Sequence, residues 1–324
     1  MLATCIACGP DAPKPVDLLD GFPVIDVHQH IYNADNFWYG DGDALFRHFY
    51  TPEMHYDTLV QRMKENSVVL AVASGPLSAV DYFYTDYPEN RSLFLYSAEF
   101  WKIGEKSLTS TVSDLCNAIK KHQVRSIGEL CGIYEGVPLD DPAYLKLYAL
   151  ADSFSLPVFL HTGIANNYKD YPEYALAESN PANLKAVLEM YPDVNFSAAR
   201  MGASSHKDYD FEDDVIEMMH TYDNFYVDIG ATTWINKSAR RTAERFIRRA
   251  IKEGLEDKLL FGSNEMIWPD AVTASINYVK CARYLDKAQK KKILYWNAAN
   301  YLKLSEREIA AHFGVCGNYK NLEQ

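Results

Sequence analysis

The chain has 324 residues, of which 48% are hydrophobic, and its 44 acidic against 32 basic residues give a formal net charge of −12. A chain of this length can bury a large core, and an α/β barrel often exceeds 200 residues as one domain. The acidic balance argues against nucleic acids and anionic membranes as partners, because no surplus of Lys and Arg is available to neutralise phosphates. We therefore expect a small-molecule partner, and self-association into a homo-oligomer stays open. The sequence contains no apolar run long enough for a membrane span.

The first 20 residues differ in composition from the rest. They carry Cys5 and Cys8 and then a stretch of Gly, Pro, Asp and Lys. We interpret residues 1–20 as an N-terminal tail and residues 21–324 as a single domain. A signal peptide normally has a basic start and a longer apolar core than this segment. The sequence thus favours a cytoplasmic protein, with the remnant of an export or lipoprotein signal as the alternative.

Short apolar runs alternate with amphipathic segments along the rest of the chain. Residues 22–31, FPVIDVHQHI, predict a buried first strand. Further strands are predicted at 67–75, 92–100, 124–130, 156–163, 194–202, 224–230 and 258–264. Helices are predicted at 52–66, 109–122, 142–154, 181–190, 211–222 and 239–253, with two more at 271–284 and 287–295. The alternation predicts an α/β fold, a (β/α)8 TIM barrel with extra C-terminal helices. A doubly wound open sheet is the alternative, disfavoured because no Gly-rich loop follows the first strand.

Polar residues stand where the predicted strands end, and this end of a TIM barrel carries the active site. His28 and His30 are two apart on one strand, so their side chains point the same way. Taken alone, they are better explained as two core or hydrogen-bonded histidines than as metal ligands. With His161 at the end of the fifth strand, they could bind one zinc ion and leave a position open for water. The other residues at these strand ends are Glu129, Arg200, Asp228, Asn264 and Glu265.

Four segments in order, IDVHQHI, VFLHTG, LLFGSN and ILYWNAANYLKL, resemble the amidohydrolase superfamily. They are most similar to its amidohydrolase 2 branch of metal-dependent hydrolases and decarboxylases. The resemblance covers nearly the whole chain and implies a distorted TIM barrel with one divalent metal ion, usually zinc. It also implies that His28, His30 and His161 are the metal ligands.

Two positions depart from the pattern of that family. Its sixth strand usually ends in a histidine, where this chain has Arg200, and its eighth strand ends in FGSD or FGTD, where this chain has FGSN with Asn264. The family's aspartate touches the metal and takes a proton from the water. The amide of Asn264 offers no charge and cannot act as a base near neutral pH. A buried Arg200 would also disfavour a nearby dication. Glu129, Asp228 and Glu265 are the carboxylates available as a substitute base.

We therefore predict a metal-dependent hydrolase that acts on a small anionic or ring-bearing substrate through metal-activated water. The predicted catalytic residues are Glu129, Arg200 and Asn264. Arg200 is also expected to bind the substrate, because a guanidinium can grip a carboxylate through two hydrogen bonds. Three tryptophans are predicted to form aromatic walls of the same site: Trp38, in the long aromatic loop after the first strand, Trp234 and Trp268.

Two alternatives stay open. The first is a decarboxylase or lyase of an aromatic or unsaturated carboxylic acid, since Arg200 would suit an anionic substrate. The second is a catalytically silent binding barrel without metal, since Arg200 and Asn264 replace the family's usual residues.

Overall fold

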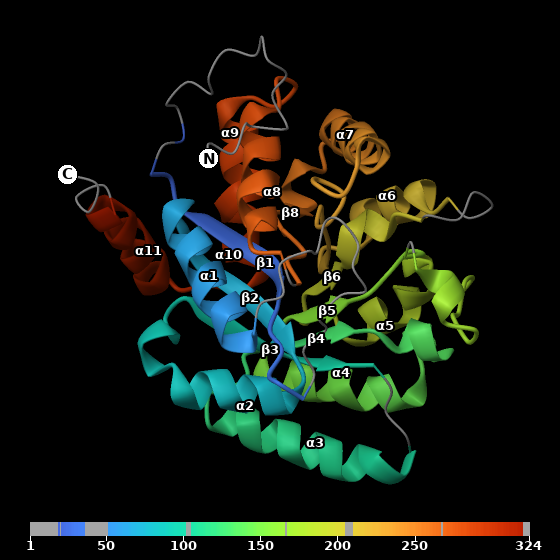
Figure 1. Ribbon diagram of the computed structural model, residues 1–324. Helices are drawn as coiled ribbons and strands as arrows, with labels where there is room; N and C mark the ends of the chain where they lie inside the picture. Colours follow the sequence, from blue (N-terminus) through green and yellow to red (C-terminus); the bar gives the residue numbers. More distant parts are fainter. Residues whose placement is uncertain are drawn as a thin grey trace. The chain divides into compact units, whose positions relative to one another are not determined.

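The computed structural model describes residues 19, 21–35, 51–101, 105–165, 167–204, 210–266 and 268–319. The strands form one eight-stranded sheet whose order follows the chain from β1 to β8 (Figure 1). Their bounds are β1 (Val24–His30), β2 (Val68–Gly75), β3 (Phe94–Phe100), β4 (Ser126–Leu130), β5 (Val158–Leu160), β6 (Phe196–Ala198), β7 (Phe225–Asp228) and β8 (Leu259–Leu260). Parallel strands in chain order with helices between them confirm the predicted TIM barrel.

The helices are α1 (Pro52–Glu65), α2 (Leu77–Asp86), α3 (Glu105–Lys120), α4 (Pro142–Phe154), α5 (Lys185–Met190), α6 (Glu212–Thr221), α7 (Lys237–Lys252), α8 (Asp270–Cys281), α9 (Lys287–Lys291), α10 (Asn297–Tyr301) and α11 (Glu306–Tyr319). Contacts within the chain define two compact units. We call Met1–Ala71 with Ile229–Gln324 the terminal unit, and Val72–Asp228 the central unit.

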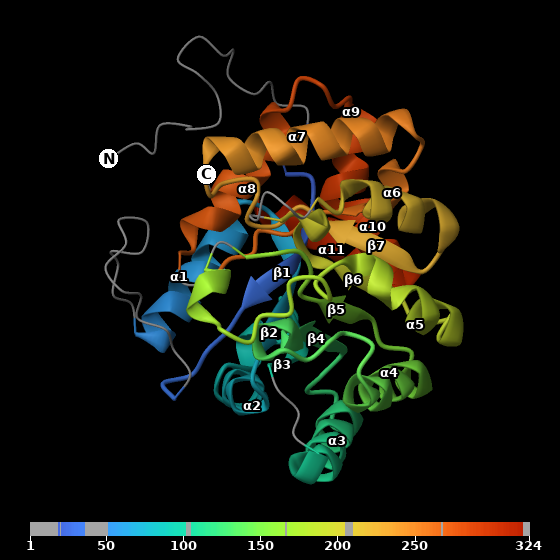
Figure 2. The ribbon, with the colours of Figure 1, turned by 90° about the vertical axis from the view of Figure 1, so that its right-hand side faces the viewer.

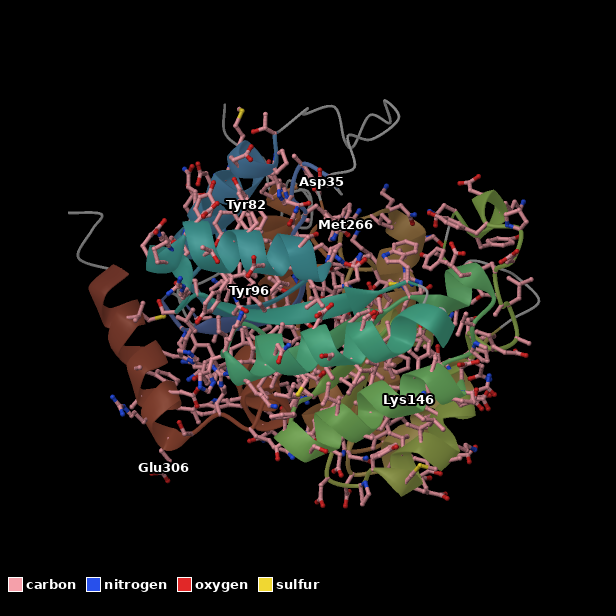
Figure 3. All side chains as sticks on the ribbon, turned by 90° about the horizontal axis from the view of Figure 1, so that it is seen from below. Asp35, Tyr82, Tyr96, Lys146, Met266 and Glu306 are labelled. Carbon is pink, nitrogen blue, oxygen red and sulfur yellow. The ribbon has the colours of Figure 1, made fainter. Side chains whose placement is uncertain are left out.

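In the central unit, strands β3 to β7 pair in parallel, each with its neighbour in the chain. Helix α4 shows why the flanking segments are helical. Asp141 accepts a hydrogen bond from the Ala143 backbone N–H at its start, and Pro142 occupies the first turn, where its missing N–H costs nothing. The helix then buries Tyr144, Leu147, Tyr148 and Ala151, which share one face at helical spacing. Figure 3 shows α2, α3 and α4 in a row, with Tyr82 and Lys146 labelled on α2 and α4.

In the terminal unit, β1 is entirely buried and lies beside β8. The Val27 backbone N–H donates to the Phe261 carbonyl at 3.0 Å, and Gln29 forms a parallel bridge with Glu265. Helices α1 and α8 pack together, and an ion pair between Arg62 and Asp270 joins them (Figure 2). The ends of β1 and β8 are thereby held side by side.

The structure differs from the predicted elements in two respects. Helices α2, α10 and α11 were not predicted. The Tyr and Phe residues of α2 have only moderate helix propensity and follow no side-chain cap. Strands β5, β6 and β8 are shorter than predicted, because the apolar pattern continues into turns. Arg200, Met201 and Asn264 have φ of 55°, 59° and 52°, which ends the extended backbone at those points.

Candidate active site

His161, directly after β5, is oriented by a carboxylate in the central unit. Its Nδ1 lies 2.8 Å from Oε1 of Glu129, and both residues are buried, each 4% exposed. A carboxylate accepts a hydrogen bond, so we assign the proton of His161 to Nδ1 and the lone pair to Nε2. This is the tautomer of a histidine that binds a metal through Nε2 while a carboxylate holds its other nitrogen.

The backbone around Glu129 is irregular. The register between β4 and β5 shifts between Ile127 and Leu130, as at a β-bulge, which re-aims the side chains on either side. Gly128 has φ of 130°, and a Cβ at this position would lie 2.0 Å from the Phe159 carbonyl oxygen. Only glycine fits there, and its bend is part of what places Glu129 beside His161.

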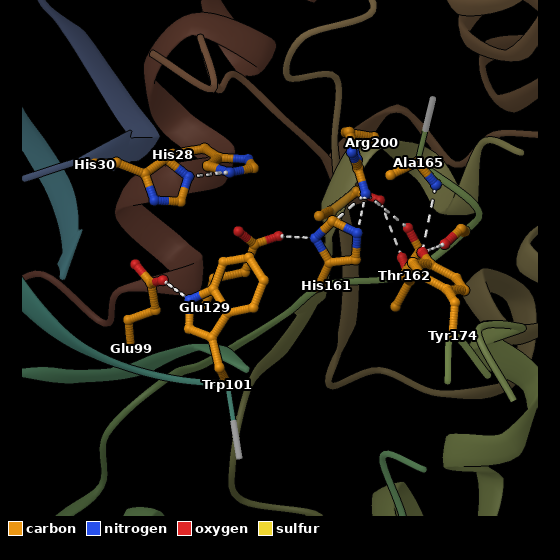
Figure 4. A network of polar contacts seen from close by, with 12 residues as sticks. His28, His30, Glu99, Trp101, Glu129, His161, Thr162, Ala165, Tyr174 and Arg200 are labelled. Carbon is orange, nitrogen blue, oxygen red and sulfur yellow. Dashed lines mark hydrogen bonds and ion pairs between the residues drawn. The ribbon is translucent and has the colours of Figure 1, made fainter. Parts of the chain in front are cut away.

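Arg200 lies at the other side of the His161 ring (Figure 4). Its Nη2 is in close contact with Nε2 of His161 and lies 3.3 Å from both the Nδ1 atom and the Thr162 carbonyl oxygen. Burial works to lower the pKa of Arg200, but the opposing influence of Tyr134 and Glu129 leaves this pKa above its usual value. The guanidinium is therefore a permanent positive charge at the atom of His161 that a metal would use.

Cys131 is a further donor in this part of the site. The thiol, a Glu129 oxygen and a His161 nitrogen lie within 4.8 Å of one another. Burial, with Glu129 and Glu99 nearby, raises the pKa of the Cys131 thiol well above its usual value. Burial thus favours the neutral thiol over the thiolate, the form that binds metals.

An aromatic cluster covers His161. The ring centroid of Tyr134 lies 4.6 Å from that of His161, 4.9 Å from Trp101 and 4.7 Å from Tyr171. Tyr134 is buried, whereas Trp101 is 37% exposed and donates its indole N–H to Glu99 (Figure 4). None of these aromatic residues was among the site residues predicted from the sequence. Trp101 directly follows β3, so the strand-end rule that found His161 would also have found Trp101.

In the terminal unit, His28 and His30 converge. Their Nε2 atoms are 3.2 Å apart, and both side chains are buried. Two ligands of a tetrahedral zinc ion, each bonded at about 2.0–2.1 Å, are separated by about 3.3 Å. The spacing of this pair therefore fits two ligands of one ion.

Asp26 connects the histidine pair to β8. Its carboxylate accepts hydrogen bonds from the backbone N–H groups of His28, at 3.2 Å, and Ser263, at 2.9 Å, and from the Gln29 amide. Burial raises the pKa of Asp26 to about 6 against the opposing influence of these hydrogen bonds. Asp26 thus fixes the end of β1 against the segment that carries Asn264.

The two residues after Ser263 have different surroundings. Asn264, 8% exposed, donates its backbone N–H to the His28 carbonyl at 2.7 Å, so it lies beside the histidine pair. Glu265 is fully buried and its Oε1 lies 2.8 Å from Nε2 of His55 on α1. Glu265 is one of the carboxylates predicted to be available as a substitute base, but its Oε1 is engaged by His55, a residue that the sequence did not mark as part of the site.

Of the three tryptophans predicted to form aromatic walls of the site, two lie within the described residues. Trp234 and Trp268 pack with ring centroids 5.2 Å apart, and the Trp234 indole N–H donates to the Ser263 carbonyl at 2.7 Å. Both therefore belong to the β8 end of the terminal unit. Trp38 lies outside the described residues. Asp228, the last residue of β7, is fully buried.

Comparison with known proteins identifies the class of this barrel. The model of the Amidohydro_2 amidohydrolase family matches residues 117–304, and the chain belongs to that family. This confirms the resemblance that the four sequence segments indicated. Within the described residues, no helix combines the length and apolar character that crossing a membrane requires.

Similar proteins and structures lie at low sequence identity. Protein fluG of Emericella nidulans is 25% identical over 170 residues, which cover 48% of this chain and only 18% of fluG. A probable 2-pyrone-4,6-dicarboxylic acid hydrolase from Acinetobacter baumannii, solved with citric acid, has a TM-score of 0.56 at 16% identity, covering 87% of this chain and 99% of that one. A 5-carboxyvanillate decarboxylase from Novosphingobium aromaticivorans, complexed with manganese, has a TM-score of 0.59 at 12% identity, covering 88% and 97%. These structures share the barrel fold with this chain.

Proposed function

We propose that the chain is a metal-dependent hydrolase of a small, carboxylate-bearing substrate, with His28, His30 and His161 as ligands of one divalent ion. The observation that supports the metal best is the 3.2 Å separation of the His28 and His30 Nε2 atoms. The Nδ1–H tautomer of His161, held by Glu129, supports the third ligand. The donors are imidazole nitrogen atoms, which suit zinc. The decarboxylase structure contains manganese, which prefers oxygen ligands, so the identity of the ion is part of the test.

When bound, such an ion acidifies a water molecule and polarises a carbonyl group. The chain's own residues would then orient the ligand histidine, transfer the proton and bind the substrate. Glu129 orients His161 and is the carboxylate we assign to proton transfer. Asn264 donates a hydrogen bond to a substrate oxygen, since its amide cannot take up a proton. Arg200 binds the substrate carboxylate, and Trp234 and Trp268 form an apolar wall.

Metal analysis of the purified protein tests this proposal. We expect about one equivalent of a divalent ion in the wild-type protein and a large loss in the variants His28→Ala and His161→Ala. His220→Ala changes an exposed histidine at the end of α6 and is the control. Less than about a tenth of an equivalent in the wild type, together with no response to His28→Ala, would contradict the proposal.

Decarboxylation is the second candidate reaction. It is favoured by the presence of an asparagine, Asn264, at the position where hydrolysis would normally use a base. Loss of CO2 breaks a C–C bond and leaves its electron pair on the carbon, which then takes a proton. This reaction needs no base at the Asn264 position, whereas hydrolysis normally uses one there. Incubation of lactones, amides and aromatic acids in 18O-labelled water separates the two reactions. Hydrolysis places 18O in the product acid, and decarboxylation releases CO2. A silent binding barrel would do neither.

A further inference from the structure

The contact between Arg200 and His161 conflicts with a metal at the same nitrogen. Nδ1 of His161 carries the proton that Glu129 accepts, so the Nε2 lone pair faces the guanidinium of Arg200. His161 has no other lone pair for an ion. The metal of the proposed function and the Arg200 side chain therefore require the same atom.

Resting on that proposed function, we propose that Arg200 and the divalent ion compete for Nε2 of His161. We further propose that a ligand carboxylate draws Arg200 away from this nitrogen. A divalent ion and a carboxylate ligand would then bind cooperatively, and Arg200 is the residue that couples them.

The contacts of Arg200 allow it to leave. Its guanidinium touches the two ring nitrogens of His161 and the Thr162 carbonyl oxygen, all of which are uncharged. Its Nε atom is buried and has no hydrogen-bond partner in the described part of the chain. A carboxylate offers two anionic oxygens that match the guanidinium fork, which a single imidazole lone pair does not. A carboxylate ligand is therefore the stronger partner for Arg200.

The charges of Arg200 and the ion also favour joint binding of the ion and a carboxylate. A guanidinium and a divalent ion at neighbouring positions repel each other, and a site with little water screens this repulsion poorly. A carboxylate between them would cancel much of the repulsion. The coupling must be reciprocal, so the ion would also tighten carboxylate binding by the same factor.

Titration with Mn2+ tests the coupling without an activity assay, because the EPR signal of the free ion reports how much is bound. The probe carboxylate is benzoate, added at millimolar concentration. In the wild-type protein we expect benzoate to tighten Mn2+ binding by about tenfold, within the roughly 5- to 150-fold range of known couplings. In Arg200→Gln, Mn2+ should bind about as tightly without benzoate as the wild type binds with it, and benzoate should have no further effect.

Arg125→Gln is the matched control, because Arg125 is an exposed arginine just before β4 and should behave as the wild type. Circular dichroism establishes that both variants are folded. If His28→Ala abolishes Mn2+ binding while Arg200→Gln changes neither affinity nor the benzoate effect, the coupling is wrong and the metal site stands. If the Arg200→Gln variant binds Mn2+ and the wild-type protein does not, Arg200 excludes the ion from His161 completely, and the proposed competition is supported. If neither protein binds Mn2+ with or without benzoate, both the coupling and the proposed function fail.

Discussion

At the scale of single residues, a few backbone positions decide which side chains reach the site. Gly128 has a φ that only glycine adopts readily, and Arg200 and Asn264 lie in the left-handed region. Gly128 lies inside β4, where the register shifts, and Arg200 and Asn264 lie in the turns that follow β6 and β8. The backbone at each position re-aims the side chains next to it. The contacts of Glu129 and Arg200 with His161 depend on these turns as much as on the side chains.

Gly128→Ala should therefore be strongly destabilising. The added Cβ would lie 2.0 Å from the Phe159 carbonyl oxygen and the φ of 130° is unfavourable for alanine, so we expect a loss of about 2–4 kcal/mol in unfolding free energy. Gly314→Ala is the control, because the residue is helical and, among the described residues outside its own helix backbone, no atom lies within 4 Å of its Cβ position. Alanine there should stabilise by about 0.5–1 kcal/mol. Chemical denaturation measures both, and equal effects would contradict the steric argument.

Asn264→Asp tests the eighth-strand position. Aspartate tolerates the left-handed φ of 52° about as well as asparagine, so the fold should not change. A carboxylate beside the His28 and His30 pair would add an anionic ligand, and we expect metal affinity to rise about tenfold or more. Metal titration measures this, with the exposed Asn300→Asp on α10 as the control. An unchanged affinity would mean that Asn264 does not face the ion.

At the scale of elements, helix α7 carries a group of arginines, of which three are exposed and two are half-buried: Arg240, Arg241, Arg245, Arg248 and Arg249. Arg248 pairs with Glu244 and Arg249 with Glu253, each four residues apart on the helix. Such exposed pairs contribute little to stability, at about 0.3–0.5 kcal/mol each. Pairing along the helix therefore accounts for two of the five arginines, Arg248 and Arg249.

Helix α11 is attached to the terminal unit by a cluster that contains a histidine. Nδ1 of His312 lies 3.0 Å from the Tyr295 hydroxyl, and the rings of Phe22, Tyr295 and Phe313 pack together. Burial lowers the pKa of His312 below its usual 6.5, despite the opposing charge of Glu308. His312 is therefore neutral while α11 is packed.

The packing of α11 should weaken in acid. Because the folded pKa lies below the unfolded one, the contribution of His312 is fully present above about pH 6.5 and is lost as the pH falls through the folded value. Hydrogen exchange should show lower protection factors in α11 at pH 5 than at pH 8, with α7 as an internal reference. His312→Gln should remove the difference, and the same pH response in that variant would assign the effect to another group.

At the scale of the whole molecule, metal binding should stabilise the fold. An ion that binds only the folded state at 100 times its dissociation constant adds about 2.7 kcal/mol, which corresponds to a rise of roughly 5 °C in melting temperature for a protein of this size. We expect this rise with Mn2+ or Zn2+, its reversal by EDTA, and its absence in His28→Ala. A rise of the same size in His28→Ala would place the stabilising ion elsewhere.

The barrel and the polar residues at the strand ends could be predicted from the sequence alone. Hydrophobic periodicity is a local property, so eight strands and most helices could be found from it, and the spacing of His28 and His30 already placed two imidazoles on one face. Helix α2 and the short lengths of β5, β6 and β8 could not be found in this way. Aromatic residues suit strand and helix alike, and an apolar run does not show where a left-handed residue ends a strand.

Only the tertiary structure decided which of the polar residues act on one another. The partners that matter are far apart in the chain: Glu129 and His161, Arg200 and His161, and His55 and Glu265. Their contacts depend on strand register and on turns at single residues, which a pattern of residue types does not encode. The sequence thus supplied the donors of the proposed metal site, and in the structure one of them, His161, lies between a carboxylate and a guanidinium.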